Sequence, residues 1–150
     1  MSLQQDVMAA MKTAMKEKDQ VALEALRAVK SAILLAQTST GSKAELSEEE
    51  ELKMLQKLVK QRKDSAAIYM EQNREDLAKP ELDQAEVISQ FLPEAMSEAD
   101  IEKVVEQTIA DVGANGMKDM GKVMGIVNKA LAGRADGKTI ATIVKAKLMA

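Results

Sequence analysis

Residues 132 to 139 read AGRADGKT, a stretch whose residue types and spacing suggest phosphate chemistry. Gly137, Lys138 and Thr139 follow the order that ends a P-loop, where backbone N–H groups and a lysine hold phosphate. Ala132 stands where that pattern needs its first glycine. A P-loop also joins a buried strand to a helix, whereas the preceding VMGIVNKALAG has helical periodicity. The stretch is therefore interpreted as a helix–loop–helix corner.

Cysteine and histidine are both absent from the 150 residues. Disulfides, thiolate or imidazole nucleophile pairs and zinc sites with sulfur or nitrogen ligands are thereby excluded. No other nucleophile with an activating base is visible in the sequence. We therefore assign no catalytic residue, no metal ligand and no cofactor, and we do not expect the chain to be an enzyme on its own.

The composition predicts an all-α protein, because helix-forming residues dominate and no run of alternating apolar and polar residues requires a strand. Capping signals and apolar spacing divide the chain into seven helices, with TSTGSK at 38–43 as a loop. Pro80 should start or kink the fourth helix. The expected helices run from Leu3 to near Lys18, from Asp19 to about Gln37, from Ser47 (in a capping box with Glu50) through Tyr69, within 74–91, from Ser97 to Gly113, from Asp119 to Gly133, and from Asp136 through Leu148.

The end of the fourth helix at Leu92-Pro93 is the expected boundary between two modules. We expect an N-terminal helical bundle or hairpin region at 1–93 and a small three-helix domain at 94–150. No segment approaches the twenty or so apolar residues that span a bilayer, and the N-terminus has no apolar core typical of a signal peptide. A cytoplasmic protein that does not interact with membranes is therefore expected.

Charge is distributed unevenly in the second module. Residues 94 to 111 carry six acids and one lysine, whereas residues 112 to 150 carry six lysines and one arginine against two aspartates. Several of these cations fall outside the apolar stripes and should face solvent as a surface for an anionic ligand. The alternative is that the acidic helix simply pairs with the basic hairpin. The cations concerned are Lys122, Lys129, Arg134, Lys138 and Lys145.

Gly121 and Gly125 lie one helical turn apart and leave a bare strip of backbone beside Lys122 and Lys129. A sugar-phosphate chain or another helix could approach closely there. The chain has one Tyr, one Phe and no Trp, so stacking on single-stranded bases is not expected. A bound RNA would be recognised through its backbone and shape.

Two further features have a structural and a functional interpretation. Arg27, Lys30 and Arg62 could form a second basic site, although we favour Arg62 reaching out of the core or pairing with a carboxylate such as Asp76, Glu81 or Glu86. The eleven methionines, including the stripe of Met8, Met11 and Met15, could line an adaptable partner groove. We interpret them as core filling.

Several segments resemble the YqeY family of small bacterial proteins: LRAVKSAI, KQRKDSAAIY, NREDLA, ISQFLPEAMSEADI and DMGKVMGIVNKALAGRADGKTI. Through its C-terminal part that family is similar to the tail domain of GatB, one of the subunits of aspartyl/glutamyl-tRNA amidotransferase, where the tail helps to hold tRNA. The resemblance implies an all-helical protein with a smaller C-terminal helical domain. It also implies RNA-phosphate contacts at Gly121, Lys122, Gly125, Gly133 and Lys138; the charge pattern adds Lys129 and Arg134.

The leading hypothesis is an accessory protein that binds the backbone of tRNA or another structured RNA, alongside an amidotransferase or another protein partner. One alternative is a helical protein–protein interaction module that binds no RNA. The other is a part of a glutamine-dependent carbon–nitrogen ligase, an activity with glutamine as amido-N-donor that only the family resemblance implies.

Overall fold

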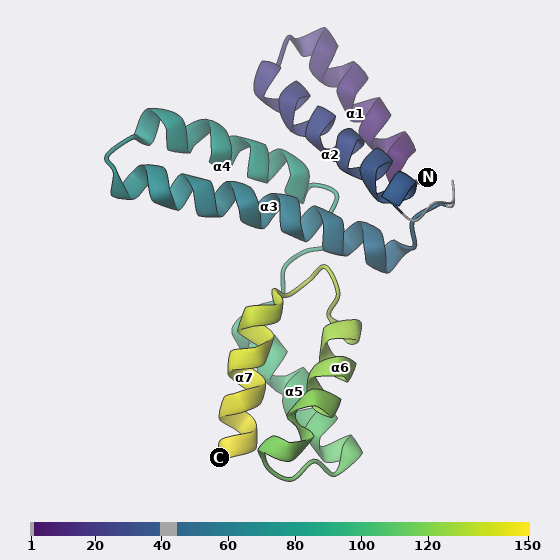
Figure 1. Ribbon diagram of the computed structural model, residues 1–150, viewed down its shortest axis with the longest axis vertical. Coiled ribbons are helices and arrows are strands. Elements are labelled where there is room, and N and C mark those ends of the chain that lie inside the picture. Colours follow the sequence, from purple (N-terminus) through teal and green to yellow (C-terminus); the bar gives the residue numbers. More distant parts are fainter. Residues whose placement is uncertain (1, 40–44) are drawn as a thin grey trace. The chain divides into compact units, whose positions relative to one another are not determined.

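The computed structural model describes residues 2–39 and 45–150, and all regular elements in these ranges are helical (Figure 1). The predicted all-α fold is confirmed. Contacts divide the chain into two compact units, Met1–Leu92 and Pro93–Ala150. Whether these units are independent domains with a boundary between 93 and 94 stays a prediction.

The N-terminal unit contains two helical hairpins. The first joins α1 (Leu3–Glu17) to α2 (Gln20–Ser39), and the second joins α3 (Glu48–Glu71) to α4 (Glu75–Ser89). Helices α3 and α4 pack along each other, and α2 packs on both α1 and α4 (Figure 1). Leu26, Val29, Leu55 and Ile88 are among the fully buried side chains that hold the two hairpins together.

The caps at the starts of α2 and α3 match their predictions. Asp19 Oδ1 accepts a hydrogen bond from the Ala22 backbone N–H at 3.1 Å. Ser47 Oγ accepts from the Glu50 N–H at 3.2 Å while the Glu50 carboxylate accepts from the Ser47 N–H at 2.8 Å. The capping box predicted for α3 is therefore confirmed.

Three helix bounds differ from the sequence-based expectation, and one of them is the end of α6 (Met120–Ala130), which stops at Ala130 and not at Gly133. Helix α2 continues to Ser39, because the Thr38 and Ser39 hydroxyls donate to carbonyls of its last turn. The remainder of the loop expected at 38–43 lies outside the described residues. Helix α4 begins at Glu75, so the expectation that Pro80 could start it is wrong. Pro80 lies within the helix on its exposed side, where water can satisfy the carbonyl that loses its N–H partner.

The C-terminal unit is a three-helix domain of α5 (Glu98–Val112), α6 (Met120–Ala130) and α7 (Gly137–Met149), with a short 3-10 turn, η1 (Met117–Asp119), before α6. Each of the three long helices packs on the other two. The core is aliphatic and includes Val105, Val123, Val127, Ile140 and Val144. Among the described residues, no helix combines the length and apolar character needed to cross a membrane.

Candidate nucleic-acid interface

Helix α6 has one buried face and one bare, basic face. Val123 and Val127 are fully buried on the first. On the opposite face Gly121, Lys122, Gly125 and Lys129 are all exposed, because residues three and four apart lie on one side of a helix. Their local spacing brings these four predicted site residues together on one surface.

The strip formed by Gly121 and Gly125 faces open space. A methyl group built on either glycine would meet no heavy atom within 4 Å, and neither residue has a positive φ. Exposed glycine within a helix costs about 1 kcal/mol relative to alanine. Nothing in the C-terminal unit therefore requires glycine at these positions, and packing against another helix of that unit does not explain them.

Gly133 has a different role. It is buried in the turn after α6 and has a φ of 80°, a conformation that residues with a Cβ adopt reluctantly. This left-handed conformation explains the glycine by backbone geometry, although α6 already ends at Ala130. Gly133 therefore shapes the corner and does not offer a surface to a ligand.

Arg134 and Lys138 lie on the corner that Gly133 creates. The Arg134 carbonyl accepts a hydrogen bond from the Met96 N–H at 2.9 Å, and its Nε donates to the Glu94 carbonyl at 3.4 Å. These bonds tie the corner to the segment before α5, while the Arg134 side chain stays exposed. Lys138, in the first turn of α7, is also exposed.

AGRADGKT is a helix–loop–helix corner, as predicted. Helix α6 precedes it where a P-loop would have a strand. The Asp136 carboxylate occupies the start of α7 by accepting hydrogen bonds from the Lys138 N–H at 2.7 Å and from the Thr139 hydroxyl at 3.0 Å. The acid stands where a P-loop would receive phosphate, so nucleotide binding of that kind is excluded here.

Pairing between the acidic helix α5 and the basic hairpin is limited to one lysine. Lys147 Nζ lies 2.7 Å from Glu106 Oε1 and 3.9 Å from Glu102 Oε2. The hydrogen bond to Glu106 raises the pKa of Lys147 above its usual value, and the charge of Glu102 adds to this effect. Within the C-terminal unit, which is described throughout, the cations expected to face solvent are exposed and have no carboxylate within 4.0 Å: Lys122, Lys129, Arg134, Lys138 and Lys145.

Two residues directly before α6, Lys118 and Asp119, differ from the sequence-based expectation. Lys118 is exposed in η1, directly before α6, and was visible only in the basic count of residues 112 to 150. Asp119 precedes α6 as predicted but makes no side-chain cap. Its Oδ2 instead accepts from the Asn115 N–H at 2.7 Å and holds the loop that leads to α6.

Of the two interpretations favoured for Arg62, an ion pair with a carboxylate is not found among the described residues. Arg62 Nε donates to Gln84 Oε1 at 3.1 Å, and its Nη1 donates to the Leu58 carbonyl at 3.1 Å. The expected pairing with a carboxylate is wrong, because Gln84 lies opposite Arg62 and Asp76 instead pairs with Arg74 at 3.0 Å.

Gln84 in turn donates to Glu24 Oε2 at 3.3 Å, so this polar chain connects α3, α4 and α2. Arg27 and Lys30, the other cations of the second basic site that the sequence suggested, are exposed on α2. Among the described residues, neither has a carboxylate within 4.0 Å.

The methionine stripe of α1 is more exposed than core filling allows. Met11 packs partly against the core of the N-terminal unit. Met8 is 46% exposed and Met15 is 58% exposed. The core-filling interpretation is wrong for these two residues, because α1 packs chiefly on α2 and leaves this edge of the helix uncovered.

The sequence of this chain matches a known protein family. The family model described as Yqey-like protein matches residues 4–148, which is nearly the whole chain. The chain belongs to the YqeY family. The resemblance based on its sequence segments is thereby confirmed, and YqeY membership covers both structural units.

One curated relative of this YqeY protein is a glutamyl-tRNA(Gln) amidotransferase subunit (designated E) of Thermococcus gammatolerans (strain DSM 15229 / JCM 11827 / EJ3). It is 43% identical over 58 residues, which are 39% of this chain and 9% of the relative. The chain therefore spans less than a tenth of that protein, and the similarity is to the tail region of such subunits.

Proposed function

We propose that the C-terminal unit binds the sugar-phosphate backbone of tRNA or another structured RNA through the solvent face of α6 and the corner before α7. The observation that carries this proposal is the set of exposed cations without carboxylate partners beside the open strip of Gly121 and Gly125. The 43% identity to part of a tRNA amidotransferase subunit supports the same ligand class.

The glycine strip and the cations around it would contact a phosphate in different ways. A phosphate can approach the α6 backbone closely over Gly121 and Gly125, where no side chain projects. Lys122 and Lys129 flank this strip and would neutralise the phosphate charge. Arg134 and Lys138 extend the basic surface around the corner, and the backbone bonds of Arg134 hold that corner in place.

A structured RNA fits this surface better than a single strand. The chain has one Tyr and one Phe, Tyr69 and Phe91, and both belong to the N-terminal unit. The C-terminal unit therefore has no aromatic ring on which an unpaired base could stack. Binding would depend on the shape and the backbone of an RNA helix, with little preference for sequence. We further propose that a protein with this function acts in the cytoplasm.

Salt dependence of RNA binding tests the proposal. If Lys122, Lys129, Arg134 and Lys138 each neutralise one phosphate, the logarithm of the association constant should fall with the logarithm of salt concentration with a slope of roughly −3. Replacing Lys122 and Lys129 with glutamine should reduce that slope by about half. Fluorescence anisotropy with labelled tRNA at several salt concentrations measures both quantities.

Lys103→Gln is the matched control, because Lys103 is exposed in the same unit but lies on the acidic helix α5. It should leave the slope unchanged. The proposal is wrong if tRNA fails to bind at low salt, or if Lys103→Gln weakens binding as much as the loss of Lys122 and Lys129.

A second candidate function is a protein-interaction module, which the exposure of Met8 and Met15 favours. Sedimentation of the chain with a purified glutamine-dependent tRNA amidotransferase, with and without tRNA, separates the two. Association that requires tRNA supports RNA binding. Association without tRNA that is lost in Met8→Ser/Met15→Ser supports the protein-interaction module.

A further inference from the structure

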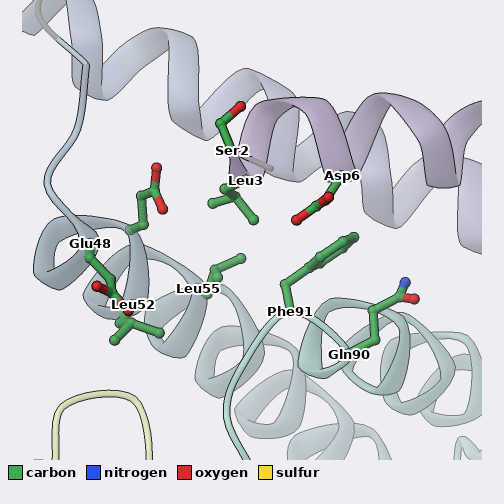
Figure 2. Close-up of a pocket in the computed structure, with 9 residues that line it drawn as sticks. Ser2, Leu3, Asp6, Glu48, Leu52, Leu55, Gln90 and Phe91 are labelled. Atoms are coloured by element: carbon green, nitrogen blue, oxygen red, sulfur yellow. The ribbon is translucent and has the colours of Figure 1, made fainter.

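A cavity of about 600 Å³ opens in the N-terminal unit, between the first turns of α1 and α3 and the segment that follows α4 (Figure 2). Leu3, Leu55 and Phe91 face one another across its apolar part, and Leu52 lies farther away on α3, beside Glu48. A volume in this range is typical of pockets that enclose small organic ligands.

Three carboxylates line the same cavity, and they come from two helices. Asp6 projects from α1 toward Phe91, and Glu48 and Glu51 belong to the first turn of α3 (Figure 2). Among residues 2–39 and 45–150, no lysine or arginine lines the cavity. Among the described residues, none of the three acids has a cation within 4.0 Å.

The other two acids in the first turn of α3, in contrast, have partners. Glu49 pairs with Lys53 at 3.0 Å, and the Glu50 carboxylate accepts the Ser47 N–H in the capping box. The start of a helix favours negative charge in general, and that explains acids anywhere in this turn. It does not explain why Glu48 and Glu51, which have no cation partner among the described residues, line an apolar cavity together with Asp6 from α1.

The environment of Glu51 is unfavourable for its charge. Partial burial raises the pKa of the Glu51 carboxyl above its usual value, and the nearby charges of Glu48 and Glu45 raise it further. An incoming cation would remove this repulsion. A bare metal ion does not fit, because no group of three acidic side chains among the described residues converges closely enough to hold one.

We propose that this cavity binds a primary alkylammonium group, with its ammonium at Asp6 or at the pair Glu48 and Glu51, and with its aliphatic chain against Leu3 and Phe91. The apolar and acidic parts of the cavity match the two ends of such a ligand. A free aliphatic diamine or polyamine and a lysine side chain presented by a partner share this chemistry. The site lies in the N-terminal unit and does not depend on RNA binding.

Titration of the full chain with diaminopentane, followed by NMR at the Phe91 ring and the Leu3 methyl groups, tests the proposal. The amine should shift these signals in a saturable manner. Pentanediol, which has the same chain without charge, and magnesium chloride at equal ionic strength should not. If either one shifts the signals as the amine does, or if the amine causes no shift, the proposal is wrong.

Charge variants show whether these carboxylates hold the amine. Whichever of Glu51→Gln and Asp6→Asn removes the carboxylate that holds the ammonium should weaken binding about three- to tenfold, as expected for loss of one partly exposed ion pair. Glu49→Gln removes the same charge from the same turn of α3 outside the cavity and should leave the affinity unchanged. Equal weakening by Glu49→Gln would show a diffuse charge effect and overturn the site.

A blocked lysine, with its amino and carboxyl ends capped, distinguishes the two sources of the ligand. Tighter binding of the blocked lysine identifies a side chain from a partner protein. Tighter binding of diaminopentane identifies a free diamine or polyamine. Either result must also be lost in Glu51→Gln or Asp6→Asn, and binding that survives both changes would contradict the assignment.

Discussion

Replacing Gly121 and Gly125 with alanine should make the C-terminal unit more stable and at the same time weaken its binding to RNA. Both effects follow from the open space beside these glycines, since a new methyl group would meet no atom of the chain within 4 Å. A mutation that improves folding and damages binding is the expected signature of a surface kept bare for a ligand.

The stability effect can be worked out from the helix. Gly125 lies in the interior of α6, where alanine should gain about 1 kcal/mol, and Gly121 lies in its first turn, where the gain should be about half as large. The double variant should therefore gain about 1.5 kcal/mol. With a denaturant dependence of about 1 kcal/mol per molar urea for so small a unit, the urea midpoint should rise by about 1.5 M.

The methyl signals of Met120 and Met124 report on this transition directly, because both residues pack against the core of the C-terminal unit. The same variant should bind tRNA more weakly, by about fivefold for each methyl group that prevents close approach of the backbone. Fluorescence anisotropy at fixed low salt measures this loss.

Thr142→Ala serves as the control for stability alone. Thr142 is exposed on α7, where alanine also favours the helix. Its hydroxyl donates to the Lys138 carbonyl at 3.0 Å, and its replacement leaves the Lys138 side chain and every other cation of the proposed surface in place. This variant should keep the affinity for RNA. Refutation would come from a double glycine variant that is stabilised yet binds RNA as well as the wild type, since the bare strip would then have no part in binding. If the double glycine variant were less stable than the wild type, the added methyl groups would not lie in open space as the structure shows.

Three further outcomes are expected. Ser47→Ala removes the acceptor of the Glu50 N–H and should destabilise the N-terminal unit by about 1 kcal/mol in urea unfolding. Gly113→Ala should cost about 1 kcal/mol through strain alone, because Gly113 has a φ of 64° in otherwise open space; an unchanged urea midpoint would contradict this. Hydrogen bonds from Ser47 lower the pKa of Glu50, whereas burial raises that of Glu51, so at neutral pH Glu50→Gln should be less stable and Glu51→Gln more stable than the wild type. The difference in unfolding free energy between Glu51→Gln and the wild type should vanish as pH falls below 4.5, the ordinary pKa of a Glu carboxyl. The difference for Glu50→Gln should vanish only below the lowered pKa of Glu50. A change of the same sign in both variants, measured by urea unfolding across this pH range, would refute the assignment.

The sequence alone determined the helices and most of their ends. The Ser47 capping box, the Asp136 cap and the left-handed Gly133 were all predictable, because each depends on residues within about four positions along the chain. The buried face of α6 was predictable for the same reason, since helical periodicity places Val123 and Val127 on one side.

The tertiary structure decided which charged and apolar groups have partners. Lys145 and Lys147 lie on the same helix, yet Lys147 alone pairs with α5, because that choice depends on which helix packs beside it. Met15 has the same local spacing as a core residue but stays exposed, because α1 packs chiefly on α2 and no helix covers that edge. Asp6 and Glu51 are far apart in the chain and line one cavity only because the fold places the first turns of α1 and α3 on two sides of it. Local spacing encodes the helices, whereas partners and cavities arise from contacts between residues that the sequence keeps far apart.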